Sequence, residues 1–460
     1  MELEPIIGLE VHIELKTLSK MFCGCPADYF GKEPNTQTCP VCLGLPGALP
    51  VPNKKAIEWT IVLSQALECR VNSNSKFDRK NYFYADLPKG YQISQYDEPI
   101  ATGGNLKFNV QNPQGGNGIE KLVRIRRVHL EEDTGKLIHG QVNGEDSTLV
   151  DFNRSGVPLV EIVTEPDLRS SDEAKAFLKE IQKIVRYLQI SDADMEKGTM
   201  RIEPSISLKQ LTVENGQLSN DGKLPDYRVE IKNINSFRFA QKAIDYEIGR
   251  QTELLLKSEK IEQQTRGWDE AHSVTVYQRS KEEAHDYRYF PEPDIPPLYF
   301  SPEFIGALPP LPELPWAKSS RFVENYKIRQ SEADLLCEDR GESDFFEQLV
   351  TVSQGRDLSP QKIANLLINK KVQRKGRPAQ EVLEEILASH TSDFDVISEV
   401  IVEVSRGVVS NNQGVINDYK NGKEKALDFL VGQVLRNLKE KGRADPNLVR
   451  QKLRELINHG

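Results

Sequence analysis

The sequence of 460 residues contains no long apolar run, and no stretch approaches the roughly 18 consecutive apolar residues of a membrane span. We therefore expect no membrane segment. The first residues, Met1 to Pro5, lack both the basic start and apolar core of a signal peptide and the Arg/Ser bias of a transit peptide. A cytoplasmic location is the resulting expectation. Six cysteines without an export signal favour reduced thiols or metal ligands over a disulfide scaffold.

The common phosphate-binding and hydrolytic motifs are also missing. The chain has no Gly-x-x-x-x-Gly-Lys-Ser/Thr loop, no Gly-x-Gly-x-x-Gly before a helix, no Gly-x-Ser-x-Gly elbow and no His-Glu-x-x-His. Any nucleotide chemistry must therefore use a less common cradle. A net charge of −9 argues against a bulk electrostatic nucleic-acid binder but leaves room for a local basic patch.

The composition, with 38% hydrophobic and 28% charged residues, is that of a soluble globular protein. Alternating segments such as Ile6 to Leu15 predict a β-rich region over residues 1–165. A capping box at Ser170 and Glu173 then opens an amphipathic helix. Further expected elements are strands near 201–208 and 227–234 and a helix over 237–257. The sequence predicts an α+β fold, with a large mixed β-rich cradle followed by all-helical modules.

Proline clusters and a change of pattern suggest the domain boundaries. The proline-rich segment 290–297 is incompatible with regular helix, and from about 316 onward the pattern is almost entirely helical. We predict a catalytic cradle over residues 1–295 with a cysteine insertion at 23–42, a helical linker domain over 296–392, and a helical tail domain over 393–460.

Ionisable side chains gather on the predicted strands of the cradle. In Ile7 to Leu15, Glu10, His12 and Glu14 share one strand face, because successive side chains alternate. A solvated strand face explains this, and so does a cluster for metal or acid–base work. The acids that follow His129 and the carboxylate of Glu161 within an apolar strand favour the second interpretation, with Mg²⁺ as a suitable cation.

Four cysteines form two tight pairs, Cys23-x-Cys25 and Cys39-x-x-Cys42. Each pair can present two thiolates to one tetrahedral ion, and the intervening loop is rich in Gly, Pro and Asn. We predict a structural Zn²⁺ site, with a redox dithiol or functionally unrelated cysteines as the alternatives. Cys69 and Cys337 stand alone and are expected in the core.

Two further segments suggest RNA. Residues 77–96 contain six aromatic residues interleaved with cations, the pattern of a surface that stacks unpaired bases, although a packed tyrosine-rich loop would look the same. Residues 436–454 carry a local net charge of +5, which suits either an RNA contact or a solvated helix face.

Several long motifs resemble those of the GatB family, which provides the B subunit of the aspartyl/glutamyl-tRNA amidotransferase. They run nearly end to end: IGLEVHIEL (7–15), SKFDRKNYFYADLPKGYQISQYD (75–97), HLEEDTGK (129–136), LVDFNRSGVPLVEIVTEPD (149–167), DADMEKGTMR (192–201), VEIKNINSF (229–237), DYRYFPEPDIPP (286–297) and GKEKALDFLVGQV (422–434). The last resembles the family's helical tRNA-binding tail.

The resemblance implies an ATP- and Mg²⁺-dependent ligase. It would phosphorylate the side-chain carboxylate of Glu or Asp misacylated on tRNA(Gln) or tRNA(Asn), and ammonia would then displace the phosphate to give the amide. The ammonia would come from a glutamine-hydrolysing amidase, the A subunit, in a heterotrimer that also contains a small C subunit. A catalytically idle, zinc-containing protein that only presents tRNA is the alternative.

The resemblance also implies roles for individual residues. His12, Glu132 and Glu161 would hold Mg²⁺, with Glu10 and Glu131 beside them. Candidates for phosphate and substrate contacts are Lys136, Asn153 and Arg154. Candidates for the aminoacylated 3′ end are Lys80, Tyr82, Tyr84, Tyr91, Gln92 and Ser94, and those for tRNA contacts in the tail are Arg436, Lys441 and Arg443. The chain departs from the family pattern at Glu203, Ser205 and Asp445.

Overall fold

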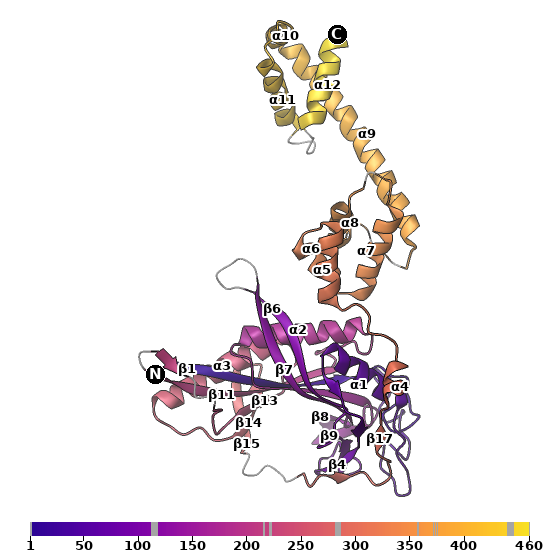
Figure 1. The fold of residues 1–460 in the computed structure, drawn as a ribbon, viewed down its shortest axis with the longest axis vertical. Helices are drawn as coiled ribbons and strands as arrows, with labels where there is room; N and C mark the ends of the chain where they lie inside the picture. Colours follow the sequence, from indigo (N-terminus) through magenta and orange to yellow (C-terminus); the bar gives the residue numbers. More distant parts are fainter. Residues whose placement is uncertain are drawn as a thin grey trace. The chain divides into compact units, whose positions relative to one another are not determined.

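The computed structural model describes residues 2–111, 118–214, 217–219, 223–280, 287–356, 358–370, 372, 374, 376–438 and 446–459. The chain divides into two compact units, Met1–Lys318 with Glu338–Arg340, and Ser319–Cys337 with Gly341–Gly460. The first combines a large sheet with helices and the second is helical (Figure 1). The predicted α+β class is confirmed.

The first unit is built on a mixed sheet whose strand order, in the described residues, is β15-β14-β13-β11-β1-β10-β7-β6-β2, with β12 beside β11. Only the β13–β14 pair is parallel in this part of the chain. The strands are β1 (Glu2–Glu14), β2 (Arg70–Val71), β6 (Ala101–Val110), β7 (Ile119–Glu132), β10 (Pro158–Thr164), β11 (Met200–Glu214), β12 (Gln217–Ser219), β13 (Val229–Lys232), β14 (Gln264–Asp269) and β15 (Val274–Ser280).

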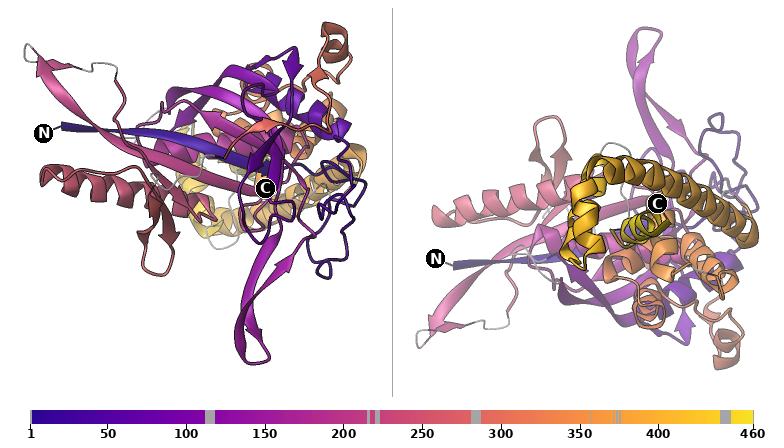
Figure 2. Two further views of the ribbon diagram at one scale, coloured as in Figure 1. Left: turned by 90° about the horizontal axis from the view of Figure 1, so that it is seen from below. Right: turned by 90° about the horizontal axis from the view of Figure 1, so that it is seen from above.

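Strand β1 lies at the centre of this sheet, side by side with β11 (Figure 2). Its alternation has the predicted effect. The side chains of Ile7, Leu9, Val11 and Ile13 belong to the hydrophobic core, so Glu10 and His12 lie on the opposite face. One central strand therefore separates the apolar layer from a polar layer.

Three helices cover the apolar face: α1 (Lys54–Ala66), α2 (Ser171–Tyr187) and α3 (Phe237–Leu256). Helix α2 begins as predicted, with the Ser170 side chain accepting a hydrogen bond from the Glu173 backbone N–H. Helix α1 is an exception to the predicted β-rich region. Its central run Thr60-Ile61-Val62 consists of residues that favour strands, but its N-cap residue Asn53 accepts hydrogen bonds from the N–H groups of Lys55 and Ala56.

Smaller elements complete the first unit. Figure 1 shows β4, β8 and β9 on the side of the sheet away from α2. One of the smaller elements is a three-stranded sheet of β16 (Phe290–Pro291), β4 (Asp78–Asn81) and β5 (Tyr91–Ser94). The others are the strand pair β17 (Leu298–Tyr299) and β3 (Asn74–Ser75), the hairpin β8 (Lys136–Val142) and β9 (Glu145–Asp151), and helix α4 (Pro302–Gly306).

The regular elements of the second unit are all helices in its described residues, as predicted. Its helices are α5 (Pro315–Tyr326), α6 (Gln330–Leu336), α7 (Arg340–Val352), α8 (Pro360–Ile368), α9 (Ala379–Asn411), α10 (Gln413–Lys420), α11 (Lys425–Leu438) and α12 (Pro446–His459). The first residues of α5 and of α7 belong to the first unit. The helices bury two separate hydrophobic clusters, one from Phe322 to Ile386 and one from Ile401 to Ile457. No helix in the described part of the chain is long and apolar enough to span a membrane.

The predicted domain boundaries at 295 and 392 stay predictions. Strand β17, just after residue 295, pairs with β3 inside the first unit. Residue 392 falls within helix α9. Cys69 and Cys337 are buried, as expected.

Candidate functional site

An acidic cluster lies on the polar face of the central sheet, where three neighbouring strands meet. His12 of β1 is directly opposite Glu161 of β10, and Glu161 is directly opposite His129 of β7. Glu161 Oε2 lies 3.3 Å from Nε2 of His12 and 3.1 Å from Nε2 of His129. Glu131, two residues after His129, is on the same face, with Oε1 3.9 Å from His12 Nε2. We call His12, His129, Glu131 and Glu161 the acidic cluster.

Burial and charge together determine the protonation of this cluster. Burial opposes ionisation of Glu161, but the imidazoles of His129 and His12 hold its pKa well below the usual value. Burial also opposes the imidazolium form of His12, yet the Glu161 carboxylate raises its pKa to about 9. Burial and then Glu161 raise the pKa of the neighbouring Glu10 to about 7. The site is thus rich in carboxylates and attracts positive charge.

The donor set fits a divalent cation. One ligand atom each from His12, Glu131 and Glu161 lie within 4.8 Å of one another. Two carboxylates offer the oxygen ligands that Mg²⁺ prefers. Among the described residues, Nδ1 of His12 and Nδ1 of His129 are buried without a hydrogen-bond partner.

The structure places Glu132 away from this cluster. Successive residues of a strand face opposite sides, so Glu131 and Glu132 diverge. Glu132 Oε1 accepts a hydrogen bond from the backbone N–H of Ile93 at 3.0 Å and lies 2.6 Å from Lys89 Nζ. The predicted set of His12, Glu132 and Glu161 is therefore not brought together, and Glu131 occupies the place expected for Glu132.

Glu203, a departure from the family pattern, extends the polar row. It is opposite Glu10 in the β1–β11 register, and its Oε2 lies 2.7 Å from Lys232 Nζ. Burial would raise the pKa of Glu203, but Lys232 lowers it to about 2. Ser205, the second departure, is opposite Gly8 and Glu230 in the neighbouring strands.

Four of the predicted substrate residues lie on or next to the β4–β5 ribbon, and one of them contacts the acidic cluster directly. Ser94 Oγ donates to Glu131 Oε2 at 2.9 Å, and Gln92 Nε2 donates to the Glu132 carbonyl oxygen at 2.7 Å. The Tyr82 hydroxyl donates to Gln92 Oε1 at 3.4 Å. Lys80 shares their face of the ribbon, and although its burial opposes the charge, Glu131 raises the pKa of the ammonium group.

The two other tyrosines predicted for the 3′ end lie elsewhere. Tyr91 is on the opposite face of the ribbon, where the Arg79 guanidinium lies 4.4 Å from its ring centroid. Tyr84 is exposed and contacts Tyr82 edge-on, with ring centroids 6.4 Å apart.

The predicted phosphate contacts occupy different environments. Lys136 begins strand β8 with an exposed side chain. Arg154 donates from Nε to the Thr134 carbonyl oxygen at 2.9 Å and from Nη2 to the Gly135 carbonyl oxygen at 2.7 Å. Asn153 is fully enclosed, and its side chain contacts the cysteine insertion.

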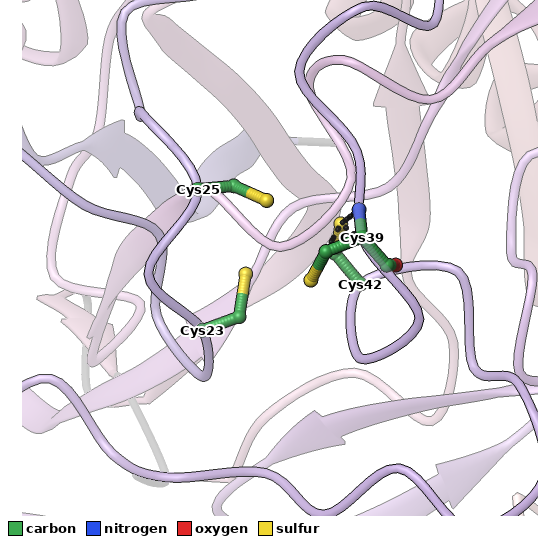
Figure 3. A group of neighbouring side chains, drawn as sticks. All are labelled: Cys23, Cys25, Cys39 and Cys42. Carbon is green, nitrogen blue, oxygen red and sulfur yellow. Dashed lines mark hydrogen bonds between the residues drawn. The ribbon is translucent and has the colours of Figure 1, made fainter.

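The four predicted zinc ligands come together from two facing segments (Figure 3). The Sγ atoms of the four cysteines all lie within 4.8 Å of one another. The Cys39 and Cys42 sulfur atoms are 3.9 Å apart, close to the spacing of about 3.8 Å expected for a tetrahedron with Zn–S bonds of about 2.3 Å. A hydrogen bond from the Cys23 thiol lowers the pKa of Cys42 to about 4, which favours the thiolate that a metal needs. The cluster is consistent with a metal site.

Comparison with known proteins identifies the family. Residues 5–306 match the model of the GatB/GatE catalytic domain, and residues 341–457 match the model of the GatB domain. The chain belongs to the GatB family. Similar relatives are the proteins named as the B subunit of aspartyl/glutamyl-tRNA(Asn/Gln) amidotransferase from Thermotoga maritima (42% identical), Moorella thermoacetica (43%) and Thermomicrobium roseum (44%). Each alignment covers 99% of this chain and at least 99% of the relative.

Two parts of the site in this GatB chain were not among the predicted residues. His129 shares the strand face of Glu131, and the alternation of β7 is the signal that would have found it. Tyr289 stacks on Tyr96, with ring centroids 4.3 Å apart, just before β16 joins the β4–β5 ribbon. The two tyrosines are 193 positions apart in the sequence, and local sequence patterns do not predict contacts over such a separation.

The predicted tRNA contacts of the GatB tail are only partly described. Arg436 is exposed in the last turn of α11. Lys441, Arg443 and the departure at Asp445 lie outside the described residues. Arg450 of α12 forms an ion pair with Asp428 across the two helices.

Proposed function

We propose that this GatB protein carries out both carboxylate activation and amidation within the tRNA-dependent amidotransferase. As an ATP-dependent ligase it would transfer the γ-phosphoryl group of ATP to the side-chain carboxylate of Glu-tRNA(Gln) or Asp-tRNA(Asn), releasing ADP. Ammonia then attacks the activated carbonyl carbon, phosphate leaves and the amide remains. The convergence of His12, Glu131 and Glu161 beneath the β4–β5 ribbon is the observation that carries the proposal.

The residues of the site suit this reaction. Bound Mg²⁺, held by His12, Glu131 and Glu161, would supply charge neutralisation for the phosphates. Ser94 orients Glu131 through its hydrogen bond. The cation of Lys80, which shares the ribbon face of Gln92 and Ser94, suits the substrate carboxylate. We assign Tyr82 and Tyr84 to the 3′ end, Lys136 and Arg154 to phosphate contacts, and Arg436 to the tRNA backbone.

The proposal includes partners and a second metal. Glutamine-derived ammonia requires a glutaminase, the amidase or A subunit, and we propose a heterotrimer with a small C subunit. We propose Zn²⁺ at Cys23, Cys25, Cys39 and Cys42, where four thiolates leave no open position and so favour a structural role. A cytoplasmic location stays a prediction.

The test separates this function from that of an idle tRNA-presenting protein. In the purified complex supplied with glutamine, ATP-dependent phosphate release on Glu-tRNA(Gln) is compared for wild type, His12→Ala and His272→Ala. His272 is an exposed histidine paired with Asp269 and serves as the matched control. We expect release to be lost in His12→Ala alone while tRNA binding is retained. Unchanged release in His12→Ala would overturn the proposal, and the same assay with Asp-tRNA(Asn) defines the substrate range.

A further inference from the structure

The loop between the two cysteine pairs, residues 26–38, contacts two separate segments of the chain. It reaches the end of hairpin β8–β9 and the turn 152–156 that follows it. It also reaches the end of β1, where the Tyr29 hydroxyl donates to Glu14, at 3.1 Å from Oε1 and 3.2 Å from Oε2. Glu14 lies two residues after His12 on the same strand face.

Asn35 fixes the loop to the end of the hairpin. Its backbone N–H donates to Asp151 Oδ1 at 3.0 Å, and its Nδ2 donates to the Val150 carbonyl oxygen at 3.0 Å. Its Oδ1 accepts from the Phe152 N–H at 2.8 Å. Asn35 has φ = 60°, a left-handed conformation that asparagine tolerates better than most residues.

Asn153 connects the turn to the loop in the opposite direction. Its Nδ2 donates to the Glu33 carbonyl oxygen at 2.7 Å, and its Oδ1 accepts from the Gln37 N–H at 2.7 Å. The side chain is fully enclosed. Both polar atoms of the Asn153 side chain are therefore hydrogen-bonded to the loop. This makes Asn153 unsuited to the phosphate contact that the resemblance implied.

Lys20 and Ser155 link the cysteine pairs themselves to the same turn. Lys20 Nζ is fully enclosed and donates to the carbonyl oxygens of Gln37 at 2.8 Å and Phe152 at 3.4 Å, with Cys42 Sγ at 3.7 Å. Ser155 Oγ donates to the Cys42 carbonyl oxygen at 3.1 Å.

This turn is also hydrogen-bonded to the strand end that carries Glu131. The Gly156 N–H donates to the Asp133 carbonyl oxygen at 2.8 Å, and the Asp133 N–H donates to the Val157 carbonyl oxygen at 2.8 Å. Gly156 has φ = +86°, which favours glycine, and a Cβ there would lie 3.4 Å from Cys42 Cβ. A continuous series of hydrogen bonds thus runs from the cysteines to β7.

We propose that the cysteine insertion is a positioning element of the acidic cluster, with Asn153 as its principal positioning residue. Metal binding by the four cysteines fixes loop 26–38, the loop fixes turn 152–156, and the turn fixes the end of β7. This inference rests on the proposed zinc site and on the proposed activity. Its structural part can be measured without turnover.

The structural test is hydrogen exchange of the intact complex, before and after zinc removal by a chelator. The Val157 N–H donates to the Arg154 carbonyl oxygen at 2.9 Å, within the turn. We expect the amides of Asp133, Gly156 and Val157 to exchange about tenfold faster without zinc, which corresponds to the loss of one or two hydrogen bonds. Asn153→Ala should have the same effect with zinc still bound, and Lys32→Ala, an exposed residue of the same loop paired with Asp28, should not. Faster exchange confined to residues 23–42 would overturn the proposal, as would full protection of all three amides in protein that holds no metal.

A kinetic split tests the positioning role. At temperatures well below unfolding, Asn153→Ala should lower kcat at least about tenfold at saturating ATP and tRNA, with KM values changed less than threefold. Tyr29→Phe, which removes only the hydroxyl, should lower kcat by a smaller factor. Loss of exchange protection with unchanged kcat would overturn the positioning role, whereas inactivity of wild type with normal protection would count against the proposed function instead.

Discussion

Glu131 and Glu132 are consecutive residues of β7, and their side chains lie on opposite faces of the strand. Glu131 accepts a hydrogen bond from Ser94 Oγ in the acidic cluster, while Glu132 forms an ion pair with Lys89, whose side chain is 9% exposed. We expect Glu131→Gln to lower Mg²⁺-dependent phosphate release by roughly 10²-fold or more, because the neutral amide removes a negative charge from the proposed cation site.

Glu132→Gln should act on stability instead. It leaves Lys89 enclosed without its carboxylate, and breaking such a pair costs about 3 kcal/mol of the free energy of unfolding. Urea unfolding and Mg²⁺ titration of phosphate release, measured on both variants, distinguish the two carboxylates. A Mg²⁺ requirement that shifts in Glu132→Gln and not in Glu131→Gln would reverse the assignment.

Zinc should be present at about one equivalent per chain in protein purified without chelator. Cys42→Ser should lose it, because Cys42 is the most buried of the four ligands and has the lowest pKa where shifts are resolved. Cys69→Ala, which removes a buried cysteine outside the cluster, is the control and should retain the metal. Metal analysis by mass spectrometry gives the ratio, and freely reactive thiols at all four positions in wild type would contradict the site.

Arg436 should contribute to tRNA affinity through phosphate. Its guanidinium has no ion-pair partner among the described residues, whereas that of Arg450 is paired with Asp428. We expect Arg436→Gln to weaken tRNA binding and reduce the slope of log K against log salt by about 0.7 to 0.9. Arg450→Gln should change the slope less. Binding isotherms at several salt concentrations provide the measurement, and equal slopes in Arg436→Gln and wild type would exclude the contact.

Glutamine should not serve this chain as a nitrogen donor by itself. Glutamine hydrolysis needs an activated nucleophile, and the paired cysteines are better explained as zinc ligands. With ATP, Mg²⁺ and misacylated tRNA, free ammonium should support amide formation, while glutamine should do so only when the amidase and the small partner protein are added. Amide formation assayed with each donor gives the answer. Glutamine-dependent product from the isolated chain would place a glutaminase centre here.

Local sequence patterns predicted the helices and strands well, but they predicted the contacts between distant strands less well. The alternation of β1 and the cap of α2 are properties of neighbouring residues, and both are as expected. The two cysteine pairs were also recognisable, since each pair is local. The alternation of β7 places His129 on the face of Glu131, but its contact with Glu161 and His12 depends on β10 lying between β1 and β7, and strand order is set by packing over long sequence separations. Glu132 entered the predicted set through the family resemblance, whereas the alternation of β7 places Glu131 on the face of His129.

The position of Lys20 predicts how the cysteine insertion varies among homologous chains. Its ammonium group is enclosed beside Cys42, and its remaining contacts are to neutral carbonyl oxygens. A descendant chain that lost the four cysteines and kept Lys20 would enclose a cation without an anion, at a cost of several kcal/mol. A descendant that lost Lys20 and kept the cysteines would leave the thiolates less neutralised. Lys20 and the cysteines should therefore appear and disappear together among homologues, as a single unit of variation.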